Sequence, residues 1–164
     1  MNASWAILAN MKTLLALFAL ASTVFAAPDF SGTWKVNIAK SNFGPMPSPE
    51  KYTRVIDHKE PSVKIEETQA SDRGEWSGIL NLKTNGTETN SEIRGNSLKS
   101  VSQWEGEVLN TKTKLELNGT PIELNDRLSL SADKQTLTLQ RKIDTPNGVL
   151  EQSVVFERQN GTVK

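Results

Sequence analysis

The fold of this chain is decided by the stretch Asp29-Phe30-Ser31-Gly32-Thr33-Trp34-Lys35-Val36-Asn37. Its apolar and polar residues alternate, which is the period of a β-strand with one buried face. A glycine two residues before a tryptophan leaves room for the indole to fold across the end of a closed sheet. We therefore expect Gly32 and Trp34 to close one end of a β-barrel.

The remainder of the chain reads as strand, turn, strand, with no convincing helical period. Turn signals such as Asn85-Gly86 and Asn118-Gly119 accept the positive φ of a tight hairpin. Together with the stretch at 29–37, these signals predict about ten strands. The later strands are expected at residues 52–59, 62–69, 74–83, 87–94, 97–104, 107–117, 120–130, 136–143 and 149–158.

A sequential meander has two unpaired edges unless its first and last strands meet. Closing the sheet removes both edges, so the sequence predicts an all-β protein: an antiparallel up-and-down meander of about 8–10 strands closed into a lipocalin-like barrel. A two-sheet sandwich remains the alternative architecture. The length of 164 residues fits one such domain, at residues 27–164, behind a leader.

The leader at residues 1–26 has the pattern of a signal peptide. Lys12 precedes the apolar run at 14–21, and Val24-Phe25-Ala26 is a small-residue pattern typical of a cleavage site. Met11 is a second candidate start, because Lys12 is the only positive charge before the apolar run. The run is shorter than the roughly 20 apolar residues of a spanning helix. We expect export to the periplasm or the medium, with no membrane span after the signal is removed.

Composition excludes several classes of function. The chain has 19 Lys and Arg against 19 Asp and Glu, without a basic run, so no nucleic-acid partner is expected. It has no cysteine, which rules out disulfides, thiolate metal sites and a cysteine nucleophile. The single histidine, His58, lies beside a turn, where we expect exposure. No metal site and no cofactor are predicted.

Residues 39–50 contain Pro45, Pro47 and Pro49 at alternate positions. Proline at these positions forbids both helix and ladder hydrogen bonding, so an extended surface loop is expected. The loop is either a lid over a pocket or a plain connector.

The motif Phe30-Ser31-Gly32-Thr33-Trp34-Lys35-Val36 resembles the first strand of the calycins, the lipocalins and fatty-acid-binding proteins. These families are antiparallel barrels that hold small apolar ligands. Lipocalins also carry a basic residue on the last strand that packs over this tryptophan, and Arg158 matches that position. The resemblance implies a barrel closed by Gly32, Trp34 and Arg158.

Two departures from the fatty-acid-binding proteins bear on function. Those proteins carry a helix-turn-helix after the first strand, where this chain has its proline-rich loop. They also carry an Arg-x-Tyr pair that grips a ligand carboxylate on the last strand, where this chain has Val154 and Phe156. The sequence therefore does not support fatty-acid binding by that grip.

Strand alternation predicts which side chains face the lumen. One half of the expected lining is large and apolar, and the middle strands contribute small hydroxylated residues, which suit a hydrated cavity or a ligand site. The candidate ligand-binding residues are Trp76, Leu80, Trp104, Leu115, Leu124, Asp126, Leu128, Arg141 and Gln152.

Asp126, Arg141 and Gln152 are polar residues on the otherwise apolar faces of three successive strands. If Leu130 pairs with Leu137, Asp126 pairs directly with Arg141. A buried carboxylate without a partner is costly, so the sequence predicts an ion pair. Its role is either structural or that of a polar anchor for a ligand.

Three functions stay open at this stage. The first is an exported barrel that binds a small, mostly apolar molecule. The second is a structural or partner-binding envelope protein with a filled barrel. The third, and least favoured, is an isomerase or hydrolase in which Asp126 is the lumen acid or base. We assign no catalytic residue, and the oligomeric state is not specified by the sequence.

Overall fold

The computed structural model describes residues 27–72 and 74–160, so the predicted signal peptide lies outside the described residues. Ten strands and one short 3₁₀ helix, η1 (Ile38–Lys40), make up its regular structure. The strands are β1 (Gly32–Val36), β2 (Lys51–Lys59), β3 (Ser62–Ser71), β4 (Gly74–Lys83), β5 (Thr89–Ile93), β6 (Asn96–Glu105), β7 (Val108–Leu117), β8 (Thr120–Leu130), β9 (Thr136–Thr145) and β10 (Gly148–Arg158).

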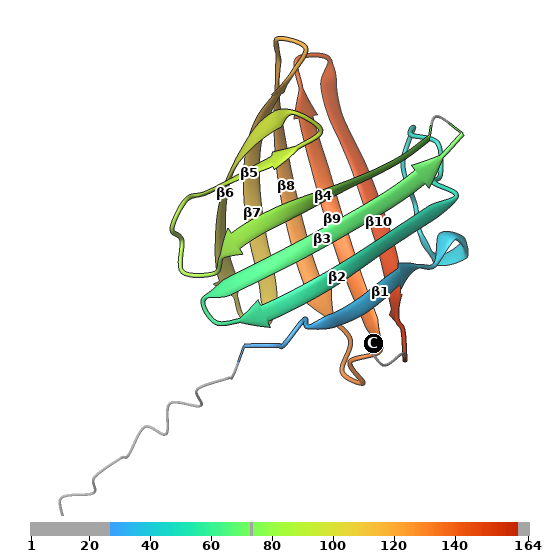
Figure 1. Ribbon diagram of the computed structural model, residues 1–164, viewed down its shortest axis with the longest axis vertical. Helices are drawn as coiled ribbons and strands as arrows, with labels where there is room; N and C mark the ends of the chain where they lie inside the picture. Colours follow the sequence, from blue (N-terminus) through green and yellow to red (C-terminus); the bar gives the residue numbers. More distant parts are fainter. Residues whose placement is uncertain (1–26, 73, 161–164) are drawn as a thin grey trace, which may run out of the picture.

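Every strand pairs antiparallel with its neighbours in sequence, and β1 also pairs with β10, which closes the barrel (Figure 1). The first and last strands meet through the pairs Trp34 with Arg158 and Val36 with Phe156. No edge strand is left open. The prediction of a closed all-β meander is confirmed, and the two-sheet sandwich is wrong.

Two hairpins turn through a pair of residues with positive φ, as the sequence predicts for Asn118-Gly119. Asn118 and Gly119 both have positive φ, at 51° and 78°, as a two-residue hairpin turn requires. Between β5 and β6, Arg94 and Gly95 do the same, at 54° and 73°.

The prediction of a tight hairpin turn at Asn85-Gly86 is wrong. The connection from β4 to β5 spans residues 84–88, because β5 begins only at Thr89. Gly86 has a φ of 82° and lies against the side chain of Gln103, which a Cβ would displace. β4 and β5 share a single register pair, Ile79 with Glu92.

One end of the barrel is filled by large side chains. Phe30, Trp34 and Phe156 have no exposed surface, and Leu137 is equally buried. The indole Nε1 of Trp34 donates to the Phe30 carbonyl at 2.9 Å, so the tryptophan is satisfied as well as buried. This packed end carries the hydrophobic core.

Arg158 covers the same tryptophan, as the calycin resemblance implies. Its guanidinium carbon lies 4.2 Å from the centroid of the Trp34 ring. Nη1 donates to the Ser31 carbonyl at 2.7 Å, and Nε donates to the Lys134 carbonyl at 2.8 Å. One side chain therefore joins the segment before β1, the β8–β9 loop and the end of β10.

The loop between η1 and β2 is tied to the barrel at its start. Asn42 forms an antiparallel bridge with Ser153 of β10, and Phe43 is buried. The described residues include no α-helix between β1 and β2, so the helix-turn-helix of the fatty-acid-binding proteins has no counterpart there. Within residues 27–72 and 74–160, no helix is long and apolar enough to cross a membrane.

Gly32 offers a direct test of the closed end. Its φ of +137° is one that L side chains rarely adopt, and a Cβ would collide with Nη1 of Arg158. Gly32→Ala is therefore expected to lower the free energy of unfolding by about 2 kcal/mol. Urea unfolding followed by tryptophan fluorescence measures this change. Gly148→Ala, which has a similar φ of +128° and no atom within 4 Å of the added Cβ, is the control for the cost of positive φ alone. Equal losses in the two variants would contradict a role for the contact with Arg158.

Candidate functional site

A cavity of about 680 Å³ occupies the half of the barrel away from the packed end. It reaches the turns after β5 and β7 and the loop after η1, whose Phe43, Met46 and Pro47 contribute to its wall. This volume lies within the usual range of small-molecule sites. The proline-rich loop therefore lies over the lumen, at the place predicted for a lid.

The cavity brings together seven of the nine candidate ligand-binding residues. They are Trp76, Leu80, Leu115, Leu124, Asp126, Arg141 and Gln152. Leu128 instead belongs to the packed core, at 5% exposure. Trp104 lies in the polar network at the packed end, described below.

A second hollow, of about 870 Å³, lies outside the barrel over β6 to β10. Its wall includes Gln103, Lys112 and Arg127, which alternate with the lumen-facing residues of the same strands. The lumen is the better candidate site, because it combines apolar walls with a few convergent polar groups.

Asp126 and Arg141 form the predicted ion pair, in the predicted register. Leu130 pairs with Leu137, Leu128 with Leu139 and Asp126 with Arg141. Arg141 donates from Nε to Oδ1 and from Nη2 to Oδ2, each at 2.7 Å. Burial lowers the pKa of Arg141, but the charge and hydrogen bonds of Asp126 outweigh it, so the pKa is raised above its ordinary value.

Gln152 lies beside this pair, since it is in register with Arg141. Its amide Nε2 donates to the Phe43 carbonyl at 3.1 Å and lies 3.0 Å from the sulfur of Met46. Gln152 therefore links the wall of the lumen to the loop that lies over it.

A second buried ion pair, between Arg54 and Glu67, was not predicted. The two residues are 2% and 6% exposed, and Arg54 Nη2 donates to Glu67 Oε1. The hydroxyl of Tyr52 accepts from Arg54 at 2.9 Å and donates to Glu67 Oε2 at 3.2 Å. Burial raises the pKa of Tyr52 to about 12, although the Arg54 charge acts in the opposite direction.

In the sequence, the adjacent acidic residues Glu66 and Glu67 suggest a solvated edge, and this interpretation is wrong for Glu67. The signal was present in the alternation of β2 and β3, where Tyr52, Arg54 and Ile56 face the same side and so do Val63, Ile65 and Glu67. Cross-strand register places Arg54 directly opposite Glu67. Pairing the two patterns would have identified the ion pair.

The small hydroxylated residues of the middle strands bond mainly to each other. Ser100 and Thr113 are 2.8 Å apart, and so are Ser102 and Thr111. All four are buried. They satisfy their own polar groups inside the barrel, and only Thr113 contributes to the cavity wall.

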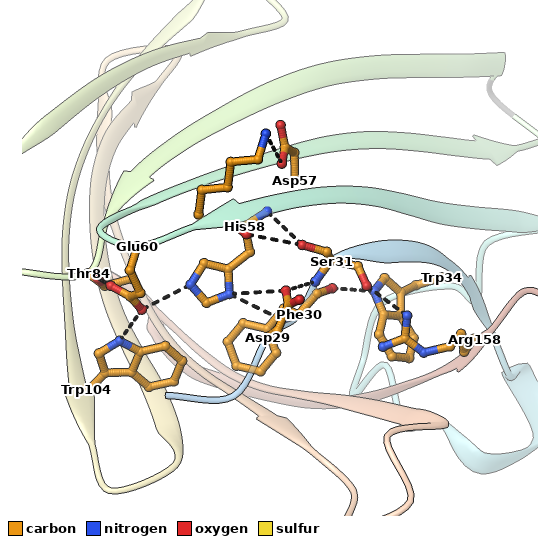
Figure 2. A network of polar contacts seen from close by, with 11 residues as sticks. Asp29, Phe30, Ser31, Trp34, Asp57, His58, Glu60, Thr84, Trp104 and Arg158 are labelled. Atoms are coloured by element: carbon orange, nitrogen blue, oxygen red, sulfur yellow. Dashed lines mark hydrogen bonds and ion pairs between the residues drawn. The ribbon is translucent and has the colours of Figure 1, made fainter. Parts of the chain in front are cut away.

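The packed end holds a polar network around His58 (Figure 2). The imidazole Nδ1 accepts from the Phe30 amide at 3.2 Å, so the proton is assigned to Nε2, which lies 3.0 Å from Glu60 Oε1. The same carboxylate oxygen accepts from Trp104 Nε1 at 2.8 Å. The expected exposure of His58 is wrong: the residue is 8% exposed, and its ring stacks with those of Phe30 and Trp104, which also contact each other.

Glu60 is held as an acceptor for three side chains. Partial burial raises its pKa, but hydrogen bonds from Thr84, His58 and Trp104 together lower it below the ordinary value. Among residues 27–72 and 74–160, no group of three or more His, Cys, Asp or Glu could hold a metal ion. Glu60 itself connects the β2–β3 turn to His58 of β2, to Thr84 after β4 and to Trp104 of β6.

Comparison with known proteins yields no matching family model and no matching curated protein. Solved structures do match over nearly their whole length. Zebrafish ileal bile acid-binding protein, complexed with cholic acid, aligns with a TM-score of 0.54 and 13% identity, covering 79% of this chain and 98% of its own. The fold is that of the calycin β-barrels.

Two further solved β-barrels are similar to this chain in fold. Human cRBP IV, a cellular retinol-binding protein, gives a TM-score of 0.52 at 19% identity, covering 80% of this chain and 99% of its own. A secretory abundant heat soluble protein of Ramazzottius varieornatus gives 0.55 at 11% identity, covering 82% and 98%. At these identities the likeness to these barrels concerns the fold alone.

The Arg54–Glu67 pair can be tested through stability. Glu67→Gln leaves a buried guanidinium without its counter-charge and is expected to cost about 3 kcal/mol. The double variant Arg54→Met with Glu67→Leu removes both charges together and is expected to cost less than about 2 kcal/mol. Urea unfolding of the three proteins measures both values. A double variant less stable than Glu67→Gln would contradict this account.

The Glu60 network predicts a pH-dependent difference in stability. Because the folded-state pKa of Glu60 lies below its ordinary 4.5, its stabilising effect is present above that value and is lost as the pH falls through the folded pKa. Glu60→Gln should therefore melt at a lower temperature than wild type at pH 7, with the gap narrowing below pH 4.5. Trp104→Phe removes one hydrogen-bond donor to Glu60. The difference between its melting temperature and that of wild type should change less with pH than the difference for Glu60→Gln. A constant gap between pH 3 and pH 7 would exclude this role.

Proposed function

We propose that this protein binds a small, mostly apolar molecule in the lumen of its barrel. The observation that carries the proposal is the cavity of about 680 Å³, whose apolar side chains surround the ion pair formed by Asp126 and Arg141. A filled barrel would leave no such volume. Barrels with the same fold carry cholic acid or are named for retinol, which supports a ligand of this size.

Binding is favoured over catalysis by the state of the lumen carboxylates. Both oxygens of Asp126 accept from Arg141, and both oxygens of Glu67 accept from Arg54 or Tyr52. A general base needs a carboxylate oxygen directed at the proton of a substrate. These carboxylates are instead directed at protein donors.

The proposal includes export. The charged start, apolar run and small-residue site of the leader support secretion, with cleavage after Ala26. The mass of the protein recovered from its own host tests this part. A mature chain that begins at Ala27 is expected, and a retained leader would contradict it.

Filling the lumen provides the test of binding. Leu115→Trp places an indole in the cavity and is expected to weaken binding of the neutral apolar dye N-phenyl-1-naphthylamine about tenfold or more. Val101→Trp, on the outer face of β6 and 37% exposed, is the matched control and should bind the dye like wild type. Dye fluorescence measures both.

A wild-type protein that does not bind the dye would refute the proposal. Native mass spectrometry of protein from its own host, followed by solvent extraction, then identifies any resident molecule. A stoichiometric apolar compound is the expected result.

A further inference from the structure

Four of the charged groups around the lumen form two ion pairs. We call Arg54, Glu67, Asp126 and Arg141 the lumen charge cluster. Two positive and two negative side chains make its formal charge zero, and Glu67, Asp126 and Arg141 line the same cavity. In the described part of the chain, no buried side-chain nitrogen or oxygen lacks a hydrogen-bond partner. Both cations of the lumen charge cluster are therefore compensated by a carboxylate.

A ligand carboxylate would meet an unfavourable environment beside this cluster. To bind Arg141 it must either add a second negative charge next to Asp126 or displace Asp126 from its guanidinium. The first arrangement places like charges in contact, and the second leaves a mostly buried carboxylate unpaired. Desolvation of the ligand anion adds to either cost.

A hydroxyl group meets favourable partners at the same place. The bidentate contact uses two of the five N–H groups of Arg141, and a carboxylate oxygen accepts more than one hydrogen bond. One hydroxyl can donate to Asp126 and accept from Arg141 without disturbing either residue. The pair then acts as a dipole that orients the ligand and leaves its own charges balanced.

A different position is available to an anion at the turn between β5 and β6. Arg94 contributes to the cavity wall, and its guanidinium carbon lies 5.9 Å from the centroid of the Trp76 ring. The described contacts give it no carboxylate partner, in contrast to Arg54 and Arg141. An acid attracted to Arg94 would keep its charged end in this turn and would leave Asp126 and Arg141 unliganded.

We propose that the lumen selects an amphiphile with an uncharged, hydroxyl-bearing inner end, an alcohol, over the carboxylic acid of the same chain. This inference rests on the proposed binding function and names the class of ligand for the same cavity. The preference is opposite to that of a carboxylate-binding Arg-x-Tyr pair, whose positions on β10 are occupied here by Val154 and Phe156.

The test compares 1-dodecanol with dodecanoate at pH 8, where the acid is ionised, by displacement of N-phenyl-1-naphthylamine. Wild type is expected to bind the alcohol at least tenfold more tightly. Because an alcohol also enters any apolar cavity more readily, the decisive measurement is the change in the ratio of the two affinities in Asp126→Asn. This variant frees Arg141, so dodecanoate should gain at least tenfold while dodecanol does not gain.

Glu105→Gln is the matched control, because it also removes one negative charge, from an exposed pair with Arg127. It should leave the ratio unchanged. If Asp126→Asn does not fold, the double variant Asp126→Leu with Arg141→Leu removes the pair as a unit, and dodecanol should then bind more weakly than to wild type. An unchanged dodecanol affinity in the double variant would overturn the inference.

The remaining outcomes separate the two proposals. If the dye, the alcohol and the acid all fail to bind, the proposed function is wrong. If the dye binds and dodecanoate binds wild type as tightly as dodecanol, the function stands and the preference for an alcohol is wrong. A dodecanoate affinity that exceeds that of dodecanol and falls in Arg94→Gln would place an acid at the turn and would also overturn the preference.

Discussion

The structure depends on the meeting of β1 with β10. Without this pairing the ten-stranded meander would expose two edges, and the lumen would be a groove. Strand pairing is reinforced by Arg158, which stacks on Trp34 and donates to carbonyls on two other segments. Gly32 provides the space for this side chain. Gly32 and Trp34 near the start of the domain and Arg158 near its end therefore stabilise the closure on which the lumen depends.

The two halves of the barrel interior differ: one is densely packed, and the other contains the cavity. At the closed end, large apolar side chains and the His58 network are packed together, whereas the other half keeps a cavity bordered by two ion pairs. In both ion pairs the partners are cross-strand neighbours, Arg54 with Glu67 and Asp126 with Arg141. The register of the sheet therefore determines the electrostatics of the lumen.

The strand pattern predicted the barrel, the register of β8 with β9 and the pair it creates, because alternation and turn residues are local signals. It missed the burial of His58, since a position beside a turn suggests exposure unless the chain before β1 is known to cover it. It also missed Glu67, whose neighbour Glu66 is exposed and made the dipeptide look solvated. Trp104 was assigned to the lumen because alternation gives the face of a strand but not the depth along the barrel axis.

The sparse pairing of β4 with β5 has a dynamic consequence. Local opening of a protein costs least where few backbone hydrogen bonds and few packed contacts must be broken. Elsewhere around the barrel neighbouring strands share three or more register pairs, but this seam has one, supplemented by the Asn81 amide bonded to the Ser91 hydroxyl at 2.9 Å. Fluctuations that widen the wall should therefore concentrate between β4 and β5, leaving the other strand pairs and both ion pairs intact.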